Sequence, residues 1–390
     1  MSVPVKATYY EFFAGGGMAR AGLEGTWECL FANDVDRMKA DVYLRNWGSK
    51  EFIAGDIAAV TIDQLPGRAD LVWASFPCQD TSVAGVGRGL GQQAALLRTR
   101  SGAFWSMMDI VRRLDADDRA PRVLVLENVL GLLTVNGGSD FVATIKSLSE
   151  NNYRSGAVVV DASLFLPQSR PRVFIIAVRK EDDAYEGVSS RNPILPWHPD
   201  PIQRARKHLS AANIEDWIWW DLGTAPQRQI ALSQIIGRER DEIKWHSADE
   251  TARLMALMSA INLDRLNDAG HRGGTAIGSL YLRMRPAGGR NEQRAEVSFN
   301  ETFGCLRTPR GGGSRPRIVV VEGKTIKSRQ IVAREAAELM GLPAQYMLPP
   351  IYDHAFKVIG DGLAVPVVKF LRDRLLRHLV VGGQIMTEAA

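Results

Sequence analysis

The chain has 390 residues, of which 45% are hydrophobic and 24% are charged, and its net charge of +4 is only mildly basic. These values are typical of a globular protein with enough residues for two or three domains. The apolar runs are too short to cross a bilayer, and the N-terminus lacks the long apolar segment of a signal peptide. We therefore expect a cytoplasmic protein without a membrane partner.

Residues 1–180 alternate short apolar runs with amphipathic stretches. The apolar runs predict strands over 8–13, 27–34, 52–57, 70–75, 122–129, 155–162 and 172–178. Helical patterns lie between them, for example over 37–47 and 102–114. Such alternation predicts an α/β domain with an open, mostly parallel sheet covered by helices. Sheets of this kind bind ligands at the carboxyl ends of their strands.

The alternation stops near residue 181, where a stretch rich in proline and polar residues begins. We read 181–325 as a separate, irregular domain that contains one continuous helix over 248–266. Its core is expected to include the tryptophan cluster of Trp217, Trp219 and Trp220. Residues 326–390 are predicted to return to the first domain through helices over 333–343 and 364–380.

Arginines without lysines are concentrated in the second domain, between His271 and Arg317. They are Arg272, Arg283, Arg285, Arg290, Arg294, Arg307, Arg310, Arg315 and Arg317. The planar guanidinium fork suits phosphates and guanine edges. The alternative is a solvated surface that happens to use arginine.

Three predicted strand ends carry residues suited to binding a nucleoside. Gly15, Gly16 and Gly17 follow the first strand and permit close approach of the backbone to a ligand. Asp34 ends the next strand, where a carboxylate can accept both hydroxyls of a ribose. Asp56 follows the third strand and can accept from an adenine amino group. Each pattern alone is weak, because an ordinary glycine-rich turn looks the same.

A thiol and a carboxyl group follow two further strands, in "FPCQ" and "LENV". The chain has three widely separated cysteines and no C-x-x-C pair, which argues against a zinc site and a disulfide framework. Cys78 is therefore either a small buried apolar residue or a nucleophile. Glu127 is either a residue beside a helix start or an acid whose apolar surroundings raise its pKa. "QSRPR" adds Gln168, Arg170 and Arg172 at alternating positions, which predicts that all three share one face of a strand.

Taken in order, these motifs resemble the bacterial-type DNA (cytosine-5) methyltransferase family. The resemblance covers nearly the whole chain except its variable middle, and rests on "FFAGGG", "ANDVD", "GDI", "FPCQ", "ENV", "QSRPR", "AREAAELMGLP" and "GDGLAVPVV". It implies a Rossmann-like methyltransferase sheet over 1–180, a target-recognition domain over 181–325, and a C-terminal segment over 326–390 that returns to the catalytic domain.

The resemblance also implies the role of each catalytic residue. Cys78 would attack carbon 6 of the target cytosine, Glu127 would hold and protonate its N3 edge, and Arg172 would reach its O2. Other residues would shape or support the pocket: Pro77, Asn128, Gln168 and Arg170. The target base would have to leave the duplex, and the glycine- and arginine-rich segment 82–102 would close over the DNA.

S-adenosyl-L-methionine is the cofactor that the resemblance implies. Its ligands would be Phe13, Gly15, Gly17, Asp34, Val35, Asp56, Ile57 and Asp361, and no metal is expected. Asp361 stands where the family commonly has an asparagine.

Double-stranded DNA is the expected partner, without an obligate protein partner. A cognate restriction endonuclease would act separately. Three alternatives stay open: an RNA cytosine-5 methyltransferase with the same catalytic set, a DNA-binding module that has lost catalysis, and a modified donor. The recognition sequence does not follow from these motifs.

Overall fold

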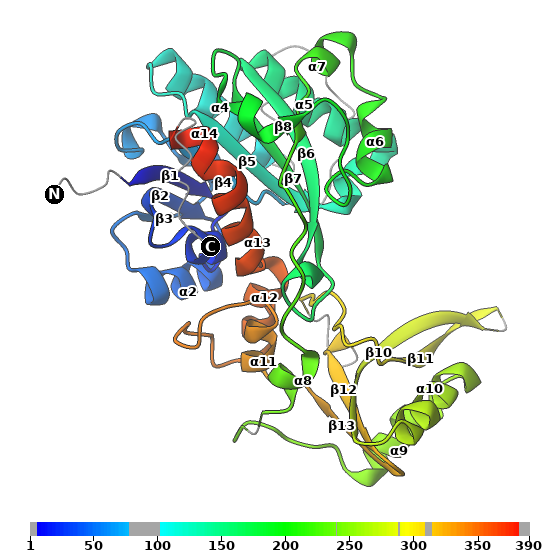
Figure 1. Cartoon of the computed structure of the whole chain (residues 1–390). Coiled ribbons are helices and arrows are strands. Elements are labelled where there is room, and N and C mark those ends of the chain that lie inside the picture. Colours follow the sequence, from blue (N-terminus) through cyan, green and yellow to red (C-terminus); the bar gives the residue numbers. More distant parts are fainter. Residues whose placement is uncertain (1–5, 78–101, 239, 288, 309–313, 382–390) are drawn as a thin grey trace. The chain divides into compact units, whose positions relative to one another are not determined.

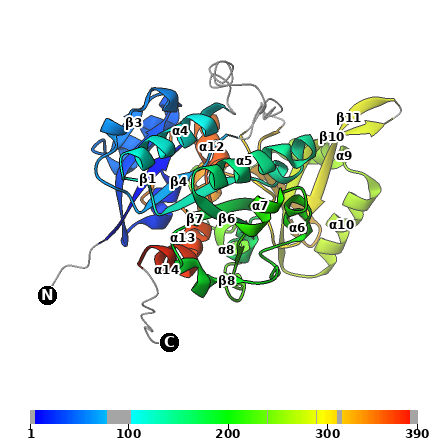
Figure 2. The same cartoon turned by 90° about the horizontal axis from the view of Figure 1, so that it is seen from above.

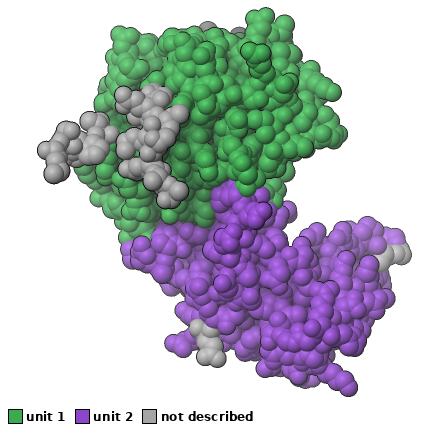
Figure 3. Space-filling view, in the orientation of Figure 1, with its two compact units in different colours: residues 1–161, 171–225, 365–390 green, residues 162–170, 226–364 purple. Residues whose placement is uncertain are grey.

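The computed structural model describes residues 6–77, 102–238, 240–287, 289–308 and 314–381. The chain forms two compact units, which Figure 3 shows in different colours. Unit 1 contains residues 1–161, 171–225 and 365–390, and unit 2 contains residues 162–170 and 226–364. The compact units thus divide the chain at other places than the predicted domains, because 181–225 belongs to unit 1 and 326–364 to unit 2.

Unit 1 is built on a seven-stranded sheet with the order β3-β2-β1-β4-β5-β7-β6. Its strands are β1 Ala7–Phe12, β2 Trp27–Asp34, β3 Phe52–Ala54, β4 Leu71–Ala74, β5 Val123–Val129, β6 Tyr153–Asp161 and β7 Pro171–Arg179. Strands β1 to β5 run parallel to one another, and β7 runs antiparallel to both β5 and β6. The predicted strands and the mostly parallel sheet are confirmed.

Helices cover both faces of this sheet, with α4 and α5 on one side and α13 and α14 on the other (Figure 2). The helices of unit 1 are α1 Met18–Leu23, α2 Arg37–Trp47, α4 Gly102–Ala116, α5 Ser139–Glu150, α6 Asp200–Arg206, α7 Ala211–Glu215, α13 Val365–Leu371 and α14 Arg377–Val381. The predicted helix over 364–380 is interrupted by one π-helical turn, Arg372–Leu376. A short strand pair, β8 Ser189–Ser190 and β9 Trp219–Trp220, lies outside the main sheet.

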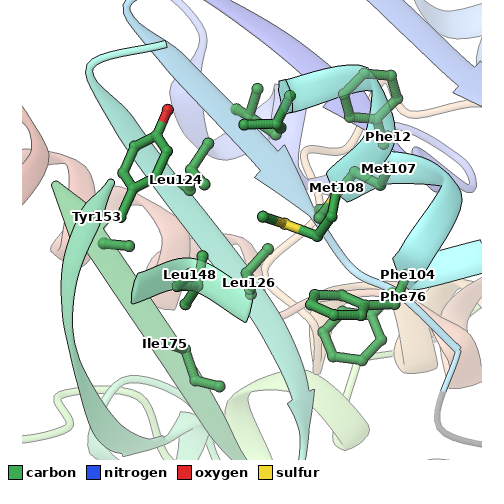
Figure 4. Packing of buried hydrophobic residues seen from close by; sticks show 14 of the residues in the cluster. Phe12, Phe76, Phe104, Met107, Met108, Leu124, Leu126, Leu148, Tyr153 and Ile175 are labelled. Carbon is green, nitrogen blue, oxygen red and sulfur yellow. The ribbon is translucent and has the colours of Figure 1, made fainter. Parts of the chain in front are cut away.

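The main core of unit 1 lies between the sheet and the helices α4 and α5. Figure 4 shows Phe76 and Phe104 packed together in this core, which also contains Met107 and Leu126. The ring centroids of the two phenylalanines are 5.2 Å apart. The buried apolar residues of α4 recur at helical spacing, and they pack against apolar side chains that recur at every second position of the strands. The helix and the strands therefore bury their apolar faces in the same core.

The tryptophan cluster is buried as predicted, but it belongs to unit 1 and not to the second domain. Trp217 and Trp219 join the α4–α5 core, and the Trp220 indole donates to the Ile176 carbonyl at 3.2 Å. The segment follows the proline-rich stretch in sequence and still returns to the sheet, where the β6 backbone pairs with it at Ser155.

The opposite face of the sheet receives the C-terminal helices through a close contact with α1. A Cβ atom at Gly22 would overlap the Val368 side chain on α13, so only glycine permits this approach. The Arg372 guanidinium then donates to the Gly22 carbonyl at 2.9 Å. Contacts between the two ends of the chain therefore complete unit 1.

Unit 2 contains a four-stranded antiparallel sheet with the order β11-β10-β12-β13. Its elements are α8 Leu232–Ile236, α9 Ala248–Ala256, α10 Ala260–His271, β10 Thr275–Ala287, β11 Arg290–Ser298, β12 Arg317–Glu322, β13 Thr325–Gln330, α11 Ala333–Glu338 and α12 Tyr352–Asp361. Apolar residues of α10 pack against β11 and β12. Within the described ranges, no helix is long and apolar enough to cross a membrane.

The predicted continuous helix over 248–266 is wrong. It is divided into α9 and α10, with Ser259 in an extended conformation at the start of α10. The break frees the Leu257 carbonyl, which accepts a hydrogen bond from the Ala295 N–H of β11 at 3.0 Å. Pairing with a strand therefore outweighs the helical propensity of this segment.

Candidate active site

The carboxyl ends of five parallel strands form one edge of the unit 1 sheet. Asp56 follows β3, Asp34 ends β2, the glycine-rich turn follows β1, Pro77 follows β4, and Glu127 lies near the end of β5. The chain order of the strands reverses at β1, which lies between β2 and β4. Ligands bind at such switch points in open α/β sheets. The structure therefore brings most of the predicted site residues to one edge.

The glycine-rich turn adopts a backbone conformation that needs glycine at two positions. Gly15 and Gly17 have φ angles of 55° and 78°, and Phe13 also has a positive φ of 57°. A Cβ atom at Gly17 would overlap the Trp47 indole, whose Nε1 donates to the Gly16 carbonyl at 3.2 Å. At Gly15 a Cβ atom would come no closer than 4.0 Å to any described residue other than its two chain neighbours. The turn is thus closed on the Trp47 side and open at Gly15.

Asp34 connects the ends of β1 and β2. One carboxylate oxygen accepts from the Gly15 N–H at 2.8 Å, and the other accepts from the Asp36 N–H at 2.8 Å. The residue is 8% exposed, and burial raises the pKa of its carboxyl although these N–H groups act to lower it. Each oxygen keeps a second lone pair for another donor. Asp34 therefore holds the turn in shape, a role that the sequence motif did not reveal.

The neighbouring cofactor candidates differ in exposure. Val35 is apolar and 68% exposed, so its side chain offers an uncovered apolar surface beside Asp34. Asp56 is exposed and its carboxylate accepts from the Ala58 N–H at 3.0 Å, at the start of the 3-10 turn Ile57–Ala59. Ile57 is 4% exposed and its side chain is part of the core. A ligand at Ile57 would therefore have to meet its backbone.

A buried polar cluster behind the turn was missed by the sequence analysis. Glu11 on β1 is 1% exposed, accepts from the Arg20 backbone N–H, and has a pKa raised by burial to about 8. The Arg20 guanidinium donates to the Tyr43 hydroxyl at 2.9 Å and pairs with Glu51 at 3.2 Å. The one available signal was an acidic residue inside the apolar strand "TYYEFF". Desolvation keeps the Glu11 carboxyl protonated at neutral pH.

Glu127 and Arg172 lie together across the strand pair β5–β7. Arg172 Nε is 3.1 Å from Glu127 Oε1, and the side chains are only 13% and 9% exposed. Asn128 is 3% exposed and its amide donates to the Phe76 carbonyl at 3.1 Å. This hydrogen bond fixes the end of β5 against the backbone one residue before Pro77. The structure therefore brings together the acid, the arginine and the segment that leads to Cys78.

Gln168 and Arg170 do not share a strand face with Arg172, so that prediction is wrong. Strand β7 begins only at Pro171. Gln168 and Arg170 precede the strand and belong to unit 2. Both are buried, and the Arg170 guanidinium donates to the carbonyls of Leu306 at 2.9 Å, Gly360 at 2.8 Å and Gly362 at 2.6 Å. The Gln168 amide donates to the Leu339 carbonyl at 2.6 Å. Both side chains therefore connect separate segments of unit 2.

Asp361 is the last residue of α12 in unit 2. Its carboxylate accepts a hydrogen bond from the Thr308 hydroxyl at 2.9 Å. Cys78 and the loop arginines Arg88, Arg98 and Arg100 lie outside the described residues. The roles predicted for them and for Asp361 stay predictions.

Comparison with known proteins relates this chain to one family. A family model described as C-5 cytosine-specific DNA methylase matches residues 7–377. Type II methyltransferase M.HpaII of Haemophilus parainfluenzae is 25% identical over 383 residues, covering 96% of this chain and 90% of the relative. Type II methyltransferase M.NgoBI of Neisseria gonorrhoeae is 25% identical over 367 residues, covering 93% and 90%.

A solved structure, that of the S. pombe Dnmt2 methyltransferase, shares the fold. The TM-score is 0.56 at 15% sequence identity, and the alignment covers 96% of this chain and 99% of that one.

Proposed function

The chain belongs to the C-5 cytosine-specific DNA methylase family, and from this we propose that it methylates a flipped cytosine within a specific duplex sequence through a covalent adduct of Cys78. As a member of that family it is a DNA (cytosine-5) methyltransferase that uses S-adenosylmethionine. The flipping of the base, the covalent adduct and the sequence specificity are the parts that we propose. Their main support is the buried Glu127–Arg172 pair beside the segment that leads to Cys78.

The edge formed by β1, β2 and β3 fits the cofactor. The open turn at Gly15 leaves room for a ligand, the Asp34 carboxylate has lone pairs left for ribose hydroxyls, and Val35 offers an apolar surface for an adenine ring. Asp56 is exposed and can accept from the adenine amino group. S-adenosylmethionine supplies an electrophilic methyl group when it is bound. Its adenosine moiety would thus lie across the ends of these strands.

Carbon 5 of cytosine is a poor nucleophile until a group adds at carbon 6. The Cys78 thiolate would form a bond to carbon 6 while Glu127 donates a proton to N3, so the electron pair of the double bond becomes available at carbon 5. Carbon 5 would take the methyl group, with S-adenosylhomocysteine as the leaving group, and a base would then remove the proton from carbon 5. The carbon 5–carbon 6 double bond would reform as Cys78 leaves as a thiolate and the proton on N3 returns to the Glu127 carboxylate. The Arg172 guanidinium beside Glu127 would donate to the cytosine O2 and orient the ring.

The target carbon atoms are stacked inside a duplex and cannot be reached there. The base must leave the helix, at a cost of a few kcal/mol in lost stacking and pairing. The segment 82–102, with Arg88, Arg98 and Arg100, would close on the phosphates around the opened site.

The direct test uses labelled S-adenosylmethionine with duplex DNA and, separately, with RNA. We expect label at carbon 5 of cytosine in DNA, and none with Cys78→Ser, whose hydroxyl is a much weaker nucleophile than a thiolate. Duplex DNA with 5-fluorocytosine at the target should give a complex that survives a denaturing gel, because fluorine cannot leave as a proton does. Label in RNA but not in DNA would establish the RNA alternative. Turnover by Cys78→Ser would exclude the covalent adduct of Cys78.

We further propose that recognition of the target sequence resides in residues 181–325, within the part of that range that belongs to unit 2. The residues of the catalytic motifs are assigned to the nucleophilic thiol, the acid and the binding of the cofactor. Few of their side chains therefore remain for contacts with bases. The arginine-rich strands of unit 2 provide such side chains. Exchanging 226–325 with the same region of a relative that has another target, followed by bisulfite sequencing, tests this. An active chimera that keeps its original target would refute it.

A further inference from the structure

Six of the nine arginines between 271 and 317 fall into two groups in the structure. Arg317 is 8% exposed and donates to the Arg315 carbonyl, and Arg315 pairs with Asp353 at 3.0 Å. These contacts of the two arginines thus lie within unit 2. A second group lies on the hairpin formed by β10 and β11: Arg283, Arg285, Arg290 and Arg294. Only this second group is arranged on one surface.

The hairpin extends well beyond the rest of its sheet (Figure 1). Residues 275–280 of β10 pair with β12, but from Tyr281 onward β10 pairs with β11 alone. The two-stranded part runs from the pair Tyr281–Glu296 to the pair Ala287–Arg290, which is seven residue pairs. At 3.3 Å per residue its length is about 23 Å. We call this part, residues 281–287 and 290–296, the ribbon.

All four arginines lie on the same face of the ribbon. Arg283 stands opposite Arg294, and Arg285 stands opposite Glu292. Because side chains alternate between the two faces, odd positions of β10 share a face with even positions of β11 in this register. The other face is uncharged and exposes four residues: Met284, Pro286, Asn291 and Gln293.

Two carboxylates connect the four guanidinium groups. Glu296 pairs with Arg283 at 3.3 Å and with Arg285 at 2.6 Å, and Glu292 pairs with Arg290 at 3.2 Å and with Arg294 at 2.7 Å. The arginine side chains are 39–81% exposed, whereas the glutamates are only 27% and 31% exposed. The carboxylates are thus more covered than the cations, and four positive against two negative charges leave the face with a net charge of +2.

Stability does not explain this arrangement, since exposed ion pairs contribute little to folding. Their effect is geometric, because a paired arginine has fewer rotamers and keeps further N–H donors for a ligand. Such donors suit a flat ligand with two adjacent acceptors. Guanine presents this pattern, O6 and N7, in the major groove of DNA.

We propose that the ribbon enters the major groove of duplex DNA with its arginine face toward the bases, and that Glu292 and Glu296 hold the arginines for guanine. This inference rests on the proposed function as a DNA methyltransferase. The major groove of B-form DNA, about 12 Å wide, admits a two-stranded ribbon, whereas that of an RNA helix is too narrow. The glutamates also repel phosphates, which reduces binding to DNA of arbitrary sequence.

The test selects bound duplexes from a random pool, using the full chain without any need for turnover. Arg285→Ala should reduce discrimination at one base pair by roughly 5- to 150-fold and leave the other positions unchanged. The matched control is Arg253→Ala, at an exposed arginine on α9, which should keep the wild-type sequence preference. A preference unchanged by Arg285→Ala and Arg283→Ala, or a uniform loss of affinity for all sequences, would overturn the proposal.

Glu296→Gln tests the positioning role. We expect tighter binding to random DNA and a steeper dependence on salt, because two guanidinium groups become free for phosphates, together with weaker sequence selection. Unchanged selection and salt dependence would show that Glu296 does not act through the arginines. Methylation is assayed in parallel. If the wild-type protein selects guanine-containing sites without methylating them, the proposed function is refuted and the proposal for the ribbon stands. If it methylates DNA but its sequence selection does not depend on the ribbon, the proposed function stands and the proposal for the ribbon is refuted.

Discussion

At the scale of single residues, Glu127 combines an observed ion pair with a proposed role as the acid. It forms a nearly buried pair with Arg172, and it lies at the end of β5 next to the backbone that precedes Pro77. Glu127→Gln keeps the size of the side chain and an oxygen that can accept from Arg172, but it removes the acid. Loss of a general acid lowers rates by about 10²- to 10⁴-fold.

We therefore expect the single-turnover rate of Glu127→Gln at saturating cofactor to fall within that range, with little change in cofactor affinity. Glu150→Gln, at an exposed position on α5, is the matched control and should leave the rate unchanged. A rate close to that of the wild type would remove Glu127 from the role of acid.

Asp34→Ala is expected to weaken S-adenosylmethionine binding more than DNA binding. Charge-assisted hydrogen bonds contribute about 1.5–3 kcal/mol each, so calorimetry should show a fall in affinity of at least tenfold. The same change frees the Gly15 and Asp36 N–H groups that the carboxylate now holds, and their hydrogen exchange should become faster. Asp41→Ala, at an exposed position on α2, is the control. Unchanged cofactor affinity would show that the ribose is held elsewhere.

Glu11→Gln should change the dependence of folding stability on pH. The pKa of the Glu11 carboxyl is raised from 4.5 to about 8 by burial, so the folded state binds more protons than the unfolded state between these values. Its favourable contribution is complete below pH 4.5 and is lost as the pH rises through 8. The neutral glutamine avoids this loss.

We expect Glu11→Gln to be more stable than the wild type at pH 9 by more than about 1 kcal/mol, since a tenfold change in proton affinity corresponds to about 1.4 kcal/mol. Near pH 4.5 the difference should become small. Urea unfolding across this pH range measures it, and a difference that does not vary with pH would contradict the assignment.

At the scale of elements, the turn between β1 and α1 depends on two separate constraints at Gly17. Its φ of 78° disfavours other residues, and a Cβ atom there would overlap the Trp47 indole. Gly25, which follows α1, has a φ of 90°, but among the described residues no atom beyond its chain neighbours lies within 4 Å of a Cβ position. A comparison of substitutions at the two glycines therefore separates the cost of backbone strain from the cost of steric overlap.

We expect Gly25→Ala to destabilise the protein by about 1 kcal/mol through backbone strain alone, and Gly17→Ala by about 2–4 kcal/mol. Urea unfolding monitors both variants. Trp47→Phe in the Gly17→Ala background should recover part of the difference. Equal costs for the two glycines would show that the Trp47 contact does not restrict the turn.

At the scale of the whole molecule, the predicted cofactor ligands are divided between the two units. Seven of the eight belong to unit 1, and Asp361 belongs to unit 2. Saturation with cofactor at one hundred times its dissociation constant stabilises the folded state by about 2.7 kcal/mol. Hydrogen exchange resolves which segments receive this protection.

We expect S-adenosylmethionine to slow exchange at residues 13–17, 34–36 and 56–58. Protection should also appear at 360–362 if Asp361 is a ligand. Protection confined to unit 1 would remove Asp361 from the set, and protection absent at 13–17 would place the cofactor away from the glycine-rich turn. The strands β10 and β11 serve as the internal control.

The sequence by itself determined the sheet and the chemical character of its edge. Strands such as 122–129 are apolar runs bounded by turns, and a buried parallel sheet requires this pattern locally. Motif residues follow directly after those strands, so the positions of Asp34 and Glu127 at the sheet edge follow from strand identity. Local signals of this kind do not depend on which distant segment packs nearby.

Only the tertiary structure decided the contacts between distant segments. Arg170, predicted near the pocket, donates to carbonyls at 306, 360 and 362, and Arg329 forms a fully buried pair with Glu335. The tryptophan cluster returned to unit 1, and the helix over 248–266 broke to pair with β11. Buried polar groups must find hydrogen-bond partners wherever the fold places them. The partner is fixed by the whole packing arrangement, which composition and periodicity along the chain do not specify.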